Sequence, residues 1–206
     1  MEKFFYPRSM VVIGASVKRL NLGHIIVLNN RQHNYEGNIY GVGREEGDIA
    51  GAPVYDSVEK IPEVPDVAII IAPAETVPDF MDACGKKGIK RLVIESGGFS
   101  EYSQGQNVLE KKVLEIADRY GMRFIGPNCI GTINFDIKMM MPFGFFPRTA
   151  PGGRVAMIVQ SGGVGGSYLG EFGDNAIIPG KFAAIGNKLQ IDEVDGLAYL
   201  LNDDKT

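Results

Sequence analysis

Unbroken runs of apolar residues recur along the first 125 positions, separated by longer polar segments. The runs cover residues 10–13, 39–42, 67–72, 92–94 and 122–125. Continuous apolar runs, unlike alternating ones, are typical of parallel strands that are covered on both faces. The segments between them are long enough for crossover helices, so the sequence predicts an α/β fold with a doubly wound parallel sheet.

Two of the intervening segments carry helix signals. Residues 77–87 follow Thr76, an N-cap candidate, have Pro78 in the first turn and end at Gly88. Residues 107–120 place apolar side chains at helical spacing and end at a glycine. The sequence therefore predicts helices over both segments.

The chain changes character after residue 126. Residues 127–153 are rich in proline and glycine, which break regular elements, so we expect an interdomain connection there. A second α/β unit then begins, with strands expected over 155–159 and 182–185 and helices after each strand. The predicted domains are thus 1–126 and 154–206. Because about fifty residues with two strands hardly bury a core, we expect a truncated form of a longer protein or a missing half supplied from elsewhere.

Composition narrows the choice of partners. Of 206 residues, 45% are apolar, and 21 basic against 25 acidic side chains leave a net charge of −4 with no long basic run. We therefore expect no nucleic acid partner. Cys84 and Cys129 lack metal-ligand spacing, so we expect no metal, no disulfide and a cytoplasmic location. Neither a signal peptide nor an apolar run of bilayer length is present, so no membrane partner is expected.

The turn after the first strand is suited to a phosphate. Gly14, Ala15 and Ser16 follow that strand, but the Gly-x-Gly-x-x-Gly pattern of a dinucleotide site is missing. The second strand ends at Val42 and is followed by Arg44, where an NAD site would place an acid for the ribose diol. A ligand with an additional phosphate on its ribose fits this pattern, which leaves coenzyme A and NADP open.

The other strand ends would complete a groove, because ligands bind beyond the carboxyl ends of parallel strands. Small residues at the third end would line a slender arm, and the fourth and fifth ends supply polar groups. The plainer alternatives are solvated charges and simple loop starts. The further candidates for ligand contact are Val17, Lys18, Arg19, Ala72, Pro73, Glu95, Ser96, Gly97 and Asn128.

A second candidate site follows the strand over 155–159. A serine nucleophile in an elbow would need glycine at position 159, which is Val159, so hydrolysis is disfavoured. A glycine-rich helix start binds anions instead. We therefore expect Ser161, Gly162 and Gly163 to form a phosphate cradle.

Two further features have ordinary explanations. Cys129 has no histidine near it in sequence, which favours a small buried residue over a nucleophile. A cluster of methionine and phenylalanine favours packing between domains, with the wall of an acyl pocket as the alternative. The cluster comprises Met139, Met140, Met141, Phe143, Phe145 and Phe146.

Taken in order, these motifs resemble the α part of the NDP-forming acyl-CoA synthetases, which include succinyl-CoA synthetase and ADP-forming acetyl-CoA synthetase. The most specific match is the stretch Gly-Pro-Asn-Cys-Ile-Gly over 126–131, and residues 7–16, 95–101, 160–163 and 186–187 match in the same order. The resemblance covers essentially the whole chain. The N-terminal residues are more similar to the ADP-forming acetyl-CoA synthetases than to succinyl-CoA synthetase. It implies a Rossmann-like CoA-binding domain followed by a flavodoxin-like ligase domain.

The resemblance also implies a reaction. Acyl-CoA, phosphate and ADP would give acid, CoA and ATP through an acyl phosphate and a phosphohistidine. The nucleotide would be held with magnesium by an ATP-grasp β subunit or fused domain, in an oligomer. CoA would contact residues 16–19, Arg44 and residues 95–97, and residues 161–163 would cradle the phosphohistidine.

This sequence departs from the family in its histidines. It holds only His24 and His33, and the phosphohistidine of the family would lie beyond Thr206. We expect His24 to be a helix-surface residue. The chain alone should therefore bind CoA without completing the ligase reaction. The alternatives are a regulatory CoA- or nucleotide-binding module without activity and, more weakly, an NADP oxidoreductase.

Overall fold

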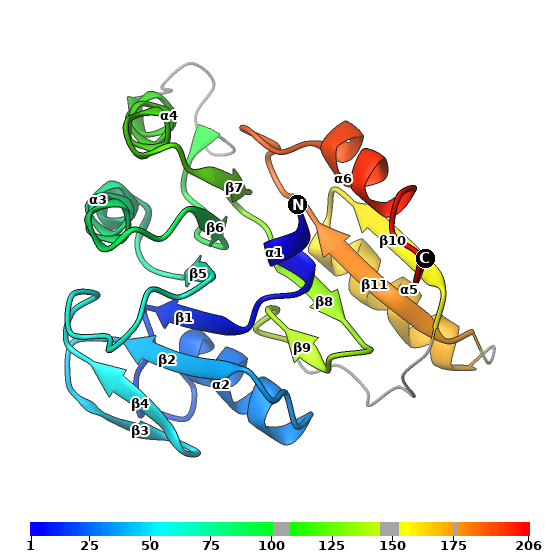
Figure 1. The fold of residues 1–206 in the computed structure, drawn as a ribbon, viewed down its shortest axis with the longest axis horizontal. Helices are drawn as coiled ribbons and strands as arrows, with labels where there is room; N and C mark the ends of the chain where they lie inside the picture. The colour runs from blue at the N-terminus through cyan, green and yellow to red at the C-terminus, as the bar shows by residue number, and fades with distance from the viewer. Residues whose placement is uncertain (101–107, 145–152, 175–176) are drawn as a thin grey trace.

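The structure is a computed structural model that describes residues 1–100, 108–144, 153–174 and 177–206. Two sheets dominate it (Figure 1). The first has seven strands in the order β3-β4-β2-β1-β5-β6-β7, and all of its pairings except β3 with β4 are parallel. Its strands are β1 (Ser9–Ile13), β2 (Asn38–Val42), β3 (Gly47–Ile49), β4 (Ala52–Tyr55), β5 (Val67–Ile70), β6 (Arg91–Ile94) and β7 (Arg123–Ile125).

The five predicted strands of this sheet are confirmed, each with small differences at its ends, but two of its strands were missed. These are β3 and β4, which form a hairpin around Ala50 and Gly51. Both turn residues have positive φ, 52° and 81°, as a two-residue hairpin turn requires. The Asp48 carboxylate accepts the Gly51 N–H at 2.8 Å and stabilises the turn. The sheet is therefore extended by an antiparallel edge.

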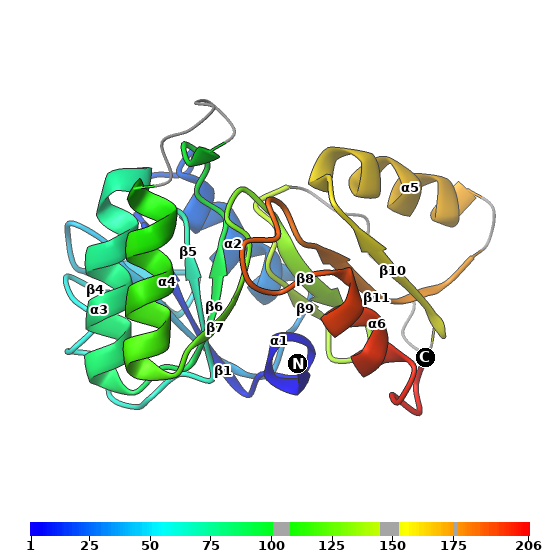
Figure 2. The ribbon, with the colours of Figure 1, turned by 90° about the horizontal axis from the view of Figure 1, so that it is seen from above.

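Helices cover both faces of the first sheet (Figure 2). On one face lie α3 (Val77–Lys87) and α4 (Val108–Tyr120), and on the other lie α1 (Glu2–Phe5), α2 (Leu22–Gln32) and the second sheet. The predicted bounds of α3 are confirmed, and Gly88 ends it in the left-handed conformation. Thr76, however, belongs to a 3-10 turn, η1 (Ala74–Thr76), and its hydroxyl donates to the Pro73 carbonyl instead of capping α3.

The second sheet corrects the prediction of an irregular connection over 127–153. Its order is β10-β11-β8-β9, and β8 and β9 come from that stretch. All residues of β8 are buried, and the strand pairs antiparallel with β11. The predicted strands and helices of the second unit are present. The elements are β8 (Gly131–Asn134), β9 (Met139–Met140), β10 (Val155–Val159), α5 (Gly162–Asp174), β11 (Pro179–Ala184) and α6 (Glu193–Leu200).

The N-terminal helix α1 joins the two sheets. Phe4 and Phe5 are fully buried in the core that lies between them. Thr132 donates its hydroxyl to the Phe4 carbonyl at 2.5 Å, and Asn134 donates its amide to the Phe5 carbonyl at 3.0 Å. These bonds attach the first five residues to β8, more than 120 positions later in the chain.

Helix α2 joins the sheets a second time, through two buried asparagines. The Met140 N–H donates to Asn30 Oδ1 at 2.9 Å, and the Asn29 amide donates to the Gly144 carbonyl at 2.6 Å. Met139 and Met141 lie in the core shared by both sheets, which confirms the packing role predicted for them. Phe145 and Phe146 lie outside the described residues.

Strand β10 has one free edge. Within the described part of the chain it pairs with β11 alone. Helix α6, which follows β11, has crossed back over β10, because a Cβ on Gly196 would lie 2.7 Å from the Ile158 side chain. Since crossovers between parallel strands are right-handed, a further parallel strand would join the sheet at β10. None of the described helices is long and apolar enough to cross a membrane.

Candidate functional site

The two sheets each place a ligand crevice at the carboxyl end of one strand. In an open α/β sheet this crevice lies where successive connections run in opposite directions from a strand. In the first sheet that strand is β1, because β2 pairs on one side of it and β5 on the other. In the second sheet the comparable loop follows β10 at Gln160 and Ser161, but within the described residues β10 is an edge strand that pairs with β11 alone. The predicted CoA turn thus follows the strand at the topological switch point of the first sheet, and the predicted phosphate cradle follows the edge strand β10.

The turn after β1 is held by backbone contacts. The N–H groups of Gly14 and Ala15 both donate to the Val42 carbonyl, at 2.8 and 3.0 Å. Gly14 has φ +96°, and a Cβ there would lie 2.1 Å from the Ile71 carbonyl oxygen. Glycine is therefore required at position 14 on both counts. The turn brings the ends of β1, β2 and β5 into contact.

Helix α2 begins at Leu22, so the exposed side chains of Lys18 and Arg19 lie on the turn and not on a helix. Asn21 is the N-cap: its side chain accepts the His24 N–H at 2.9 Å and donates to the Gly14 carbonyl at 3.0 Å. Gly23 packs on Ala15, with only 2.8 Å between a Cβ on Gly23 and the Ala15 Cα. Gly23 therefore allows α2 to pack closely on the turn after β1, which is the role of the third glycine in a dinucleotide fingerprint. Here a longer loop separates this glycine from the strand.

His24 differs from the helix-surface residue that we expected. Its ring is half-buried, and Nδ1 lies 3.0 Å from the Ser16 carbonyl oxygen. The imidazole therefore fixes the far side of the turn. Sequence reasoning missed both Asn21 and His24, although an asparagine directly before a helical segment is a recognisable N-cap signal.

Arg44 lies beside this turn. The preceding residue, Gly43, is in such close contact that a Cβ there would lie 2.1 Å from the Ala15 carbonyl oxygen. The Arg44 side chain is exposed, and Val17 packs near Gly47 at the start of β3. The structure therefore brings the predicted cation to the rim of the turn, where a ligand phosphate could reach it.

The loops after β5, β6 and β7 form the floor of the predicted groove. The Ala72 N–H donates to Ser96 Oγ at 3.0 Å, and the Asn128 N–H donates to the Ser96 carbonyl at 2.9 Å. Asn128 has φ +57°, which asparagine tolerates better than most residues. Ser96 is thus buried as the central link of the floor, while Pro73 and Gly97 are exposed along it.

The same floor reaches the second crevice. The Asn128 side-chain amide donates to Asn187 Oδ1 at 3.4 Å, and the Asn187 N–H donates to the Pro127 carbonyl at 2.9 Å. The Gly186 N–H donates to the Gln160 carbonyl at 3.1 Å, and the Gln160 side-chain amide donates to the Gly186 carbonyl at 3.2 Å. A continuous series of hydrogen bonds therefore joins the loop after β7 to the loops after β10 and β11.

The start of α5 is open toward this second crevice. Ser161 Oγ accepts the Val164 N–H at 3.4 Å, in an N-cap arrangement. A Cβ on Gly162 would lie 2.7 Å from Ile130, whereas on Gly163 it would meet only the Ser161 hydroxyl, at 3.9 Å. The first turn of α5 therefore presents backbone N–H groups that could bind an anion.

Glu95 is the unusual group of the site. Its side chain is 5% exposed, and no donor among the described residues bonds either carboxylate oxygen. Burial raises the pKa of this carboxyl well above its ordinary value. Burial therefore favours the neutral form of this carboxylic acid.

Replacing Glu95 with glutamine should make the protein more stable than wild type, by a margin that increases as the pH rises. A carboxyl that is neutral when folded and ionised when unfolded lowers stability as pH rises, by up to about 1.4 kcal/mol per pH unit above about pH 4.3. Glutamine keeps the shape and the neutrality. Thermal unfolding of both proteins at pH 4, 6 and 8 measures the gap, with Glu110→Gln on α4 as the control. A gap that is the same at pH 4 and pH 8 would contradict the neutral state of Glu95.

Both cysteines are buried, as expected for Cys129. Burial raises the pKa of the Cys84 thiol to about 12, and burial also raises the pKa of Cys129. The Cys129 thiol donates to the Ile94 carbonyl at 3.3 Å. Neither thiol is activated as a nucleophile. Across the described ranges, no group of three or more acidic, histidine or cysteine side chains could hold a metal.

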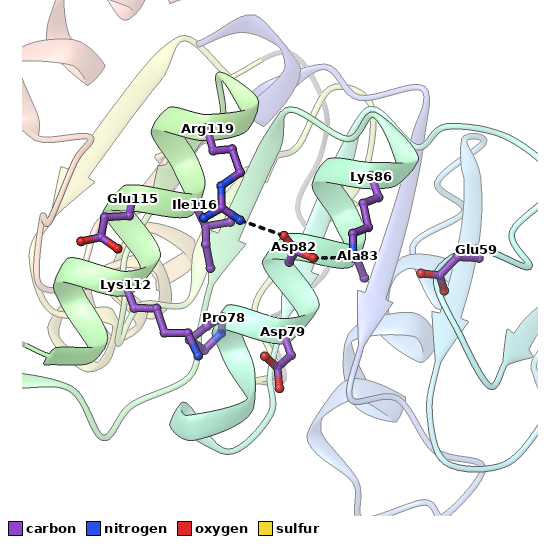
Figure 3. Close-up of a pocket in the computed structure, with 10 residues that line it drawn as sticks. All are labelled: Glu59, Pro78, Asp79, Asp82, Ala83, Lys86, Lys112, Glu115, Ile116 and Arg119. Atoms are coloured by element: carbon purple, nitrogen blue, oxygen red, sulfur yellow. Dashed lines mark ion pairs between the residues drawn. The ribbon is translucent and has the colours of Figure 1, made fainter.

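A groove between α3 and α4 is separate from the strand ends (Figure 3). Asp82 lies in it and is already paired with Lys86 at 2.7 Å and Arg119 at 3.5 Å. The Tyr120 hydroxyl also donates to Asp82 at 2.8 Å. The central carboxylate of this groove is therefore already paired, and the strand-end loops described above are the candidate site.

Two family patterns cover most of the chain. Residues 8–134 match the family described as CoA binding domain, and residues 152–206 match the family described as succinyl-CoA ligase like flavodoxin domain. The first match alone extends over more than half of the chain. The fold predicted from the sequence, an α/β CoA-binding domain followed by the start of a flavodoxin-like domain, is confirmed.

Individual relatives agree with these families. The ADP-forming acetate–CoA ligase I of Archaeoglobus fulgidus is 41% identical over 207 residues, which cover 100% of this chain and 30% of that protein. The α subunit of the ADP-forming acetate–CoA ligase I of Pyrococcus furiosus is 36% identical and is covered to 45%. The apo structure of the dinucleotide forming acetyl-coenzyme A synthetase 1 of Ca. Korarchaeum cryptofilum has a TM-score of 0.92 at 32% identity, over 100% of this chain and 44% of that one.

The chain spans less than half the length of each of these relatives. The first family match covers the seven-stranded sheet and β8, and the second covers β10, α5, β11 and α6. The chain therefore belongs to the CoA binding domain family, in the form that makes up the α part of NDP-forming acyl-CoA synthetases.

Proposed function

We propose that this chain is the CoA-binding portion of an acid–thiol ligase that converts acyl-CoA, phosphate and ADP into acid, CoA and ATP. The observation that supports the proposal is the series of hydrogen bonds that joins the loops after β6 and β7 to the loops after β10 and β11. The first crevice suits CoA and the second suits a phosphoryl group. Their contact is what a transfer between thioester and phosphate requires.

CoA fits the first crevice on two grounds. Gly14 and Gly43 let the ends of β1, β2 and β5 pack closely behind the turn, and Arg44 adds a cation at its rim. When bound, CoA supplies the thiol that carries the acyl group. The residues assigned to it are Gly14, Ala15, Ser16, Val17, Lys18, Arg19, Val42, Arg44, Ala72, Pro73, Glu95, Ser96, Gly97 and Asn128.

Ser161, Gly162 and Gly163 would hold the phosphoryl group at the start of α5. The helix dipole contributes about 0.3–1 kcal/mol to an anion there. Neither histidine of the chain is placed for phosphoryl transfer, since His24 bonds Ser16 and His33 lies 2.9 Å from the Asn29 carbonyl. We therefore assign the phosphohistidine to a segment beyond Thr206 and the magnesium nucleotide to an ATP-grasp partner or domain. A solved relative was determined in complex with phosphate and ADP.

The free edge of β10 supports an assembly larger than this chain. Val155, Val194 and Leu197 near that edge are 44%, 68% and 52% exposed. A further parallel strand with its helix would cover them and complete the phosphate crevice. We expect the chain alone to bind CoA but to form no ATP from acetyl-CoA, phosphate and ADP, and ATP synthesis by the chain alone would contradict this division of labour.

Arg44→Ala should weaken CoA binding about tenfold and leave dephospho-CoA binding unchanged. A charge-assisted contact to the ribose phosphate contributes about 1.5–3 kcal/mol, and 1.4 kcal/mol is a tenfold change in Kd. Calorimetry with CoA, dephospho-CoA and NADP measures the difference. Arg91→Ala, at the opposite end of the sheet, is the matched control. Equal affinity of wild type for CoA and dephospho-CoA would remove the role of Arg44, and a preference for NADP would overturn the proposed function.

A further inference from the structure

The imidazole of His24 uses only one of its two ring nitrogens. Nδ1 lies 3.0 Å from the Ser16 carbonyl oxygen. A carbonyl oxygen can only accept a hydrogen bond, so Nδ1 carries a proton and donates it. Nε2 has no hydrogen-bond partner within the described part of the chain, and it is not among the buried side-chain atoms that lack one. Nε2 is therefore open to solvent on a half-buried ring.

The turn beside this ring offers further donors to an anion. The N–H groups of Ser16, Val17 and Arg19 have no acceptor among the described residues, and that of Lys18 donates to Ser16 Oγ at 3.3 Å. The Lys18 and Arg19 side chains are exposed on the same turn. Because the phosphates of CoA would lie on this turn, the His24 ring borders the proposed phosphate site.

The surroundings of His24 leave its ring without a neutralising carboxylate. Helix α2 packs on β1, β2, β3 and β9. The titratable groups of those strands are Tyr40, which donates to Glu63, and Asp48, which accepts the Gly51 N–H. The other charged or titratable groups are Arg31 and His33 on α2 itself, and Lys18, Arg19, Arg44, Glu45 and Glu46 on the turn and the loop after β2. Over the described ranges, the bond to Ser16 is the only one that the His24 ring makes.

Resting on the proposed function, we propose that His24 binds the diphosphate of CoA through Nε2 and takes up a proton as CoA binds. In the neutral ring Nε2 carries a lone pair, which repels a phosphate oxygen. In the protonated ring Nε2–H donates a charge-assisted hydrogen bond to that oxygen, while Nδ1 keeps its bond to Ser16. Histidine changes charge between about pH 5 and pH 8. Binding therefore draws a proton from the solvent, and CoA binds more tightly as the pH falls.

Calorimetry of dephospho-CoA binding to the whole 206-residue chain tests this. This ligand keeps the diphosphate but lacks the ribose phosphate, which itself titrates near pH 6. Binding heats at pH 7 in buffers of different ionisation enthalpy give the number of protons taken up. We expect wild type to take up part of one proton and to bind about tenfold more tightly at pH 5.5 than at pH 8.5. His24→Asn should take up none and lose most of this pH dependence.

The two histidines of the chain provide a matched pair. The His24→Asn amide can replace Nδ1–H as the donor to Ser16, so the variant removes the charge and keeps the turn. His33→Asn is the control, because His33 makes the same kind of bond, to the Asn29 carbonyl at 2.9 Å, at the opposite end of α2. It should keep the proton uptake of wild type. In this control every imidazole NMR signal belongs to His24, and its titration midpoint should rise when dephospho-CoA is added.

The possible failures are distinguishable. Binding of dephospho-CoA without proton uptake, or with equal uptake by wild type and His24→Asn, would overturn the role of His24 and leave the proposed function standing. Failure of wild type to bind both CoA and dephospho-CoA would overturn the proposed function, and the role of His24 with it. If His24→Asn does not fold, the NMR titration of His33→Asn decides, and a midpoint that the ligand leaves unchanged would contradict the proposal.

Discussion

Replacing Phe4 and Phe5 together with alanine is expected to leave a chain whose two sheets no longer fold as one unit. Both rings are fully buried between the sheets, and Phe5 stacks on Tyr199 of α6 with centroids 5.3 Å apart. Each truncation costs about 3–5 kcal/mol, and a typical native protein is stable by only about 5–15 kcal/mol. The loss therefore takes most of the available stability.

Urea unfolding followed by circular dichroism measures this effect. We expect Phe5→Ala alone to lower the midpoint and to split unfolding into two transitions, one for each sheet. Leu201→Ala is the matched control, because that side chain is apolar but 84% exposed. A double variant that unfolds in one transition at the wild-type midpoint would show that α1 does not join the sheets.

The second large effect is expected at a buried ion pair. Lys181 on β11 is 1% exposed along its side chain and donates to Asp203 at 2.6 Å. Its ammonium group also lies 5.4 Å from the centre of the Tyr6 ring. Removing one partner of a buried pair costs about 3–5 kcal/mol, because the other charge is left uncompensated. Asp203→Asn should therefore lower the free energy of unfolding by about that amount.

The contribution of this pair should depend on pH in a defined window. Burial opposes both charges, but the hydrogen bond between them lowers the pKa of Asp203 and raises the pKa of Lys181. A depressed carboxyl pKa gives stability above the unfolded value of about 3.9, and a raised lysine pKa gives stability below the unfolded value of about 10.4. The difference between wild type and Asp203→Asn should thus be full near neutral pH and disappear in acid.

The double variant Lys181→Met, Asp203→Leu provides the control. Replacing a whole buried pair with apolar residues is often neutral or stabilising. We expect this variant to be more stable than Asp203→Asn at pH 7, as measured by urea unfolding. An Asp203→Asn variant with wild-type stability at pH 7 would contradict the account of the pair.

The sequence predicted the strands with continuous apolar runs and missed those without them. Strands β1, β5 and β6 are buried on both faces, so their patterns carry the whole signal. Strand β8 reads Gly-Thr-Ile-Asn and lies in a stretch interrupted by proline. Its polar side chains are buried because Thr132 and Asn134 bond α1, a partner far away in sequence. Local patterns hold no information about such a partner.

The candidate site was also predicted only in part from the sequence. Gly14, Ser161 and Arg44 were predicted because they follow strands, and topology then places strand ends together. Gly23 and His24 were missed as parts of the turn because a longer loop separates them from β1. The unpartnered state of Glu95 depends on packing near Gly131, which no spacing rule reports. The domain boundaries and the ligand contacts remain predictions.

The most direct test of the central claim is a crystal structure of the 206-residue chain with CoA. The account predicts density for the phosphates along the turn from Gly14 to Arg19, with the ribose phosphate at Arg44 and the thiol end between Glu95 and Asn128. Density for CoA at another place on the surface, or an empty turn at saturating CoA, would contradict it.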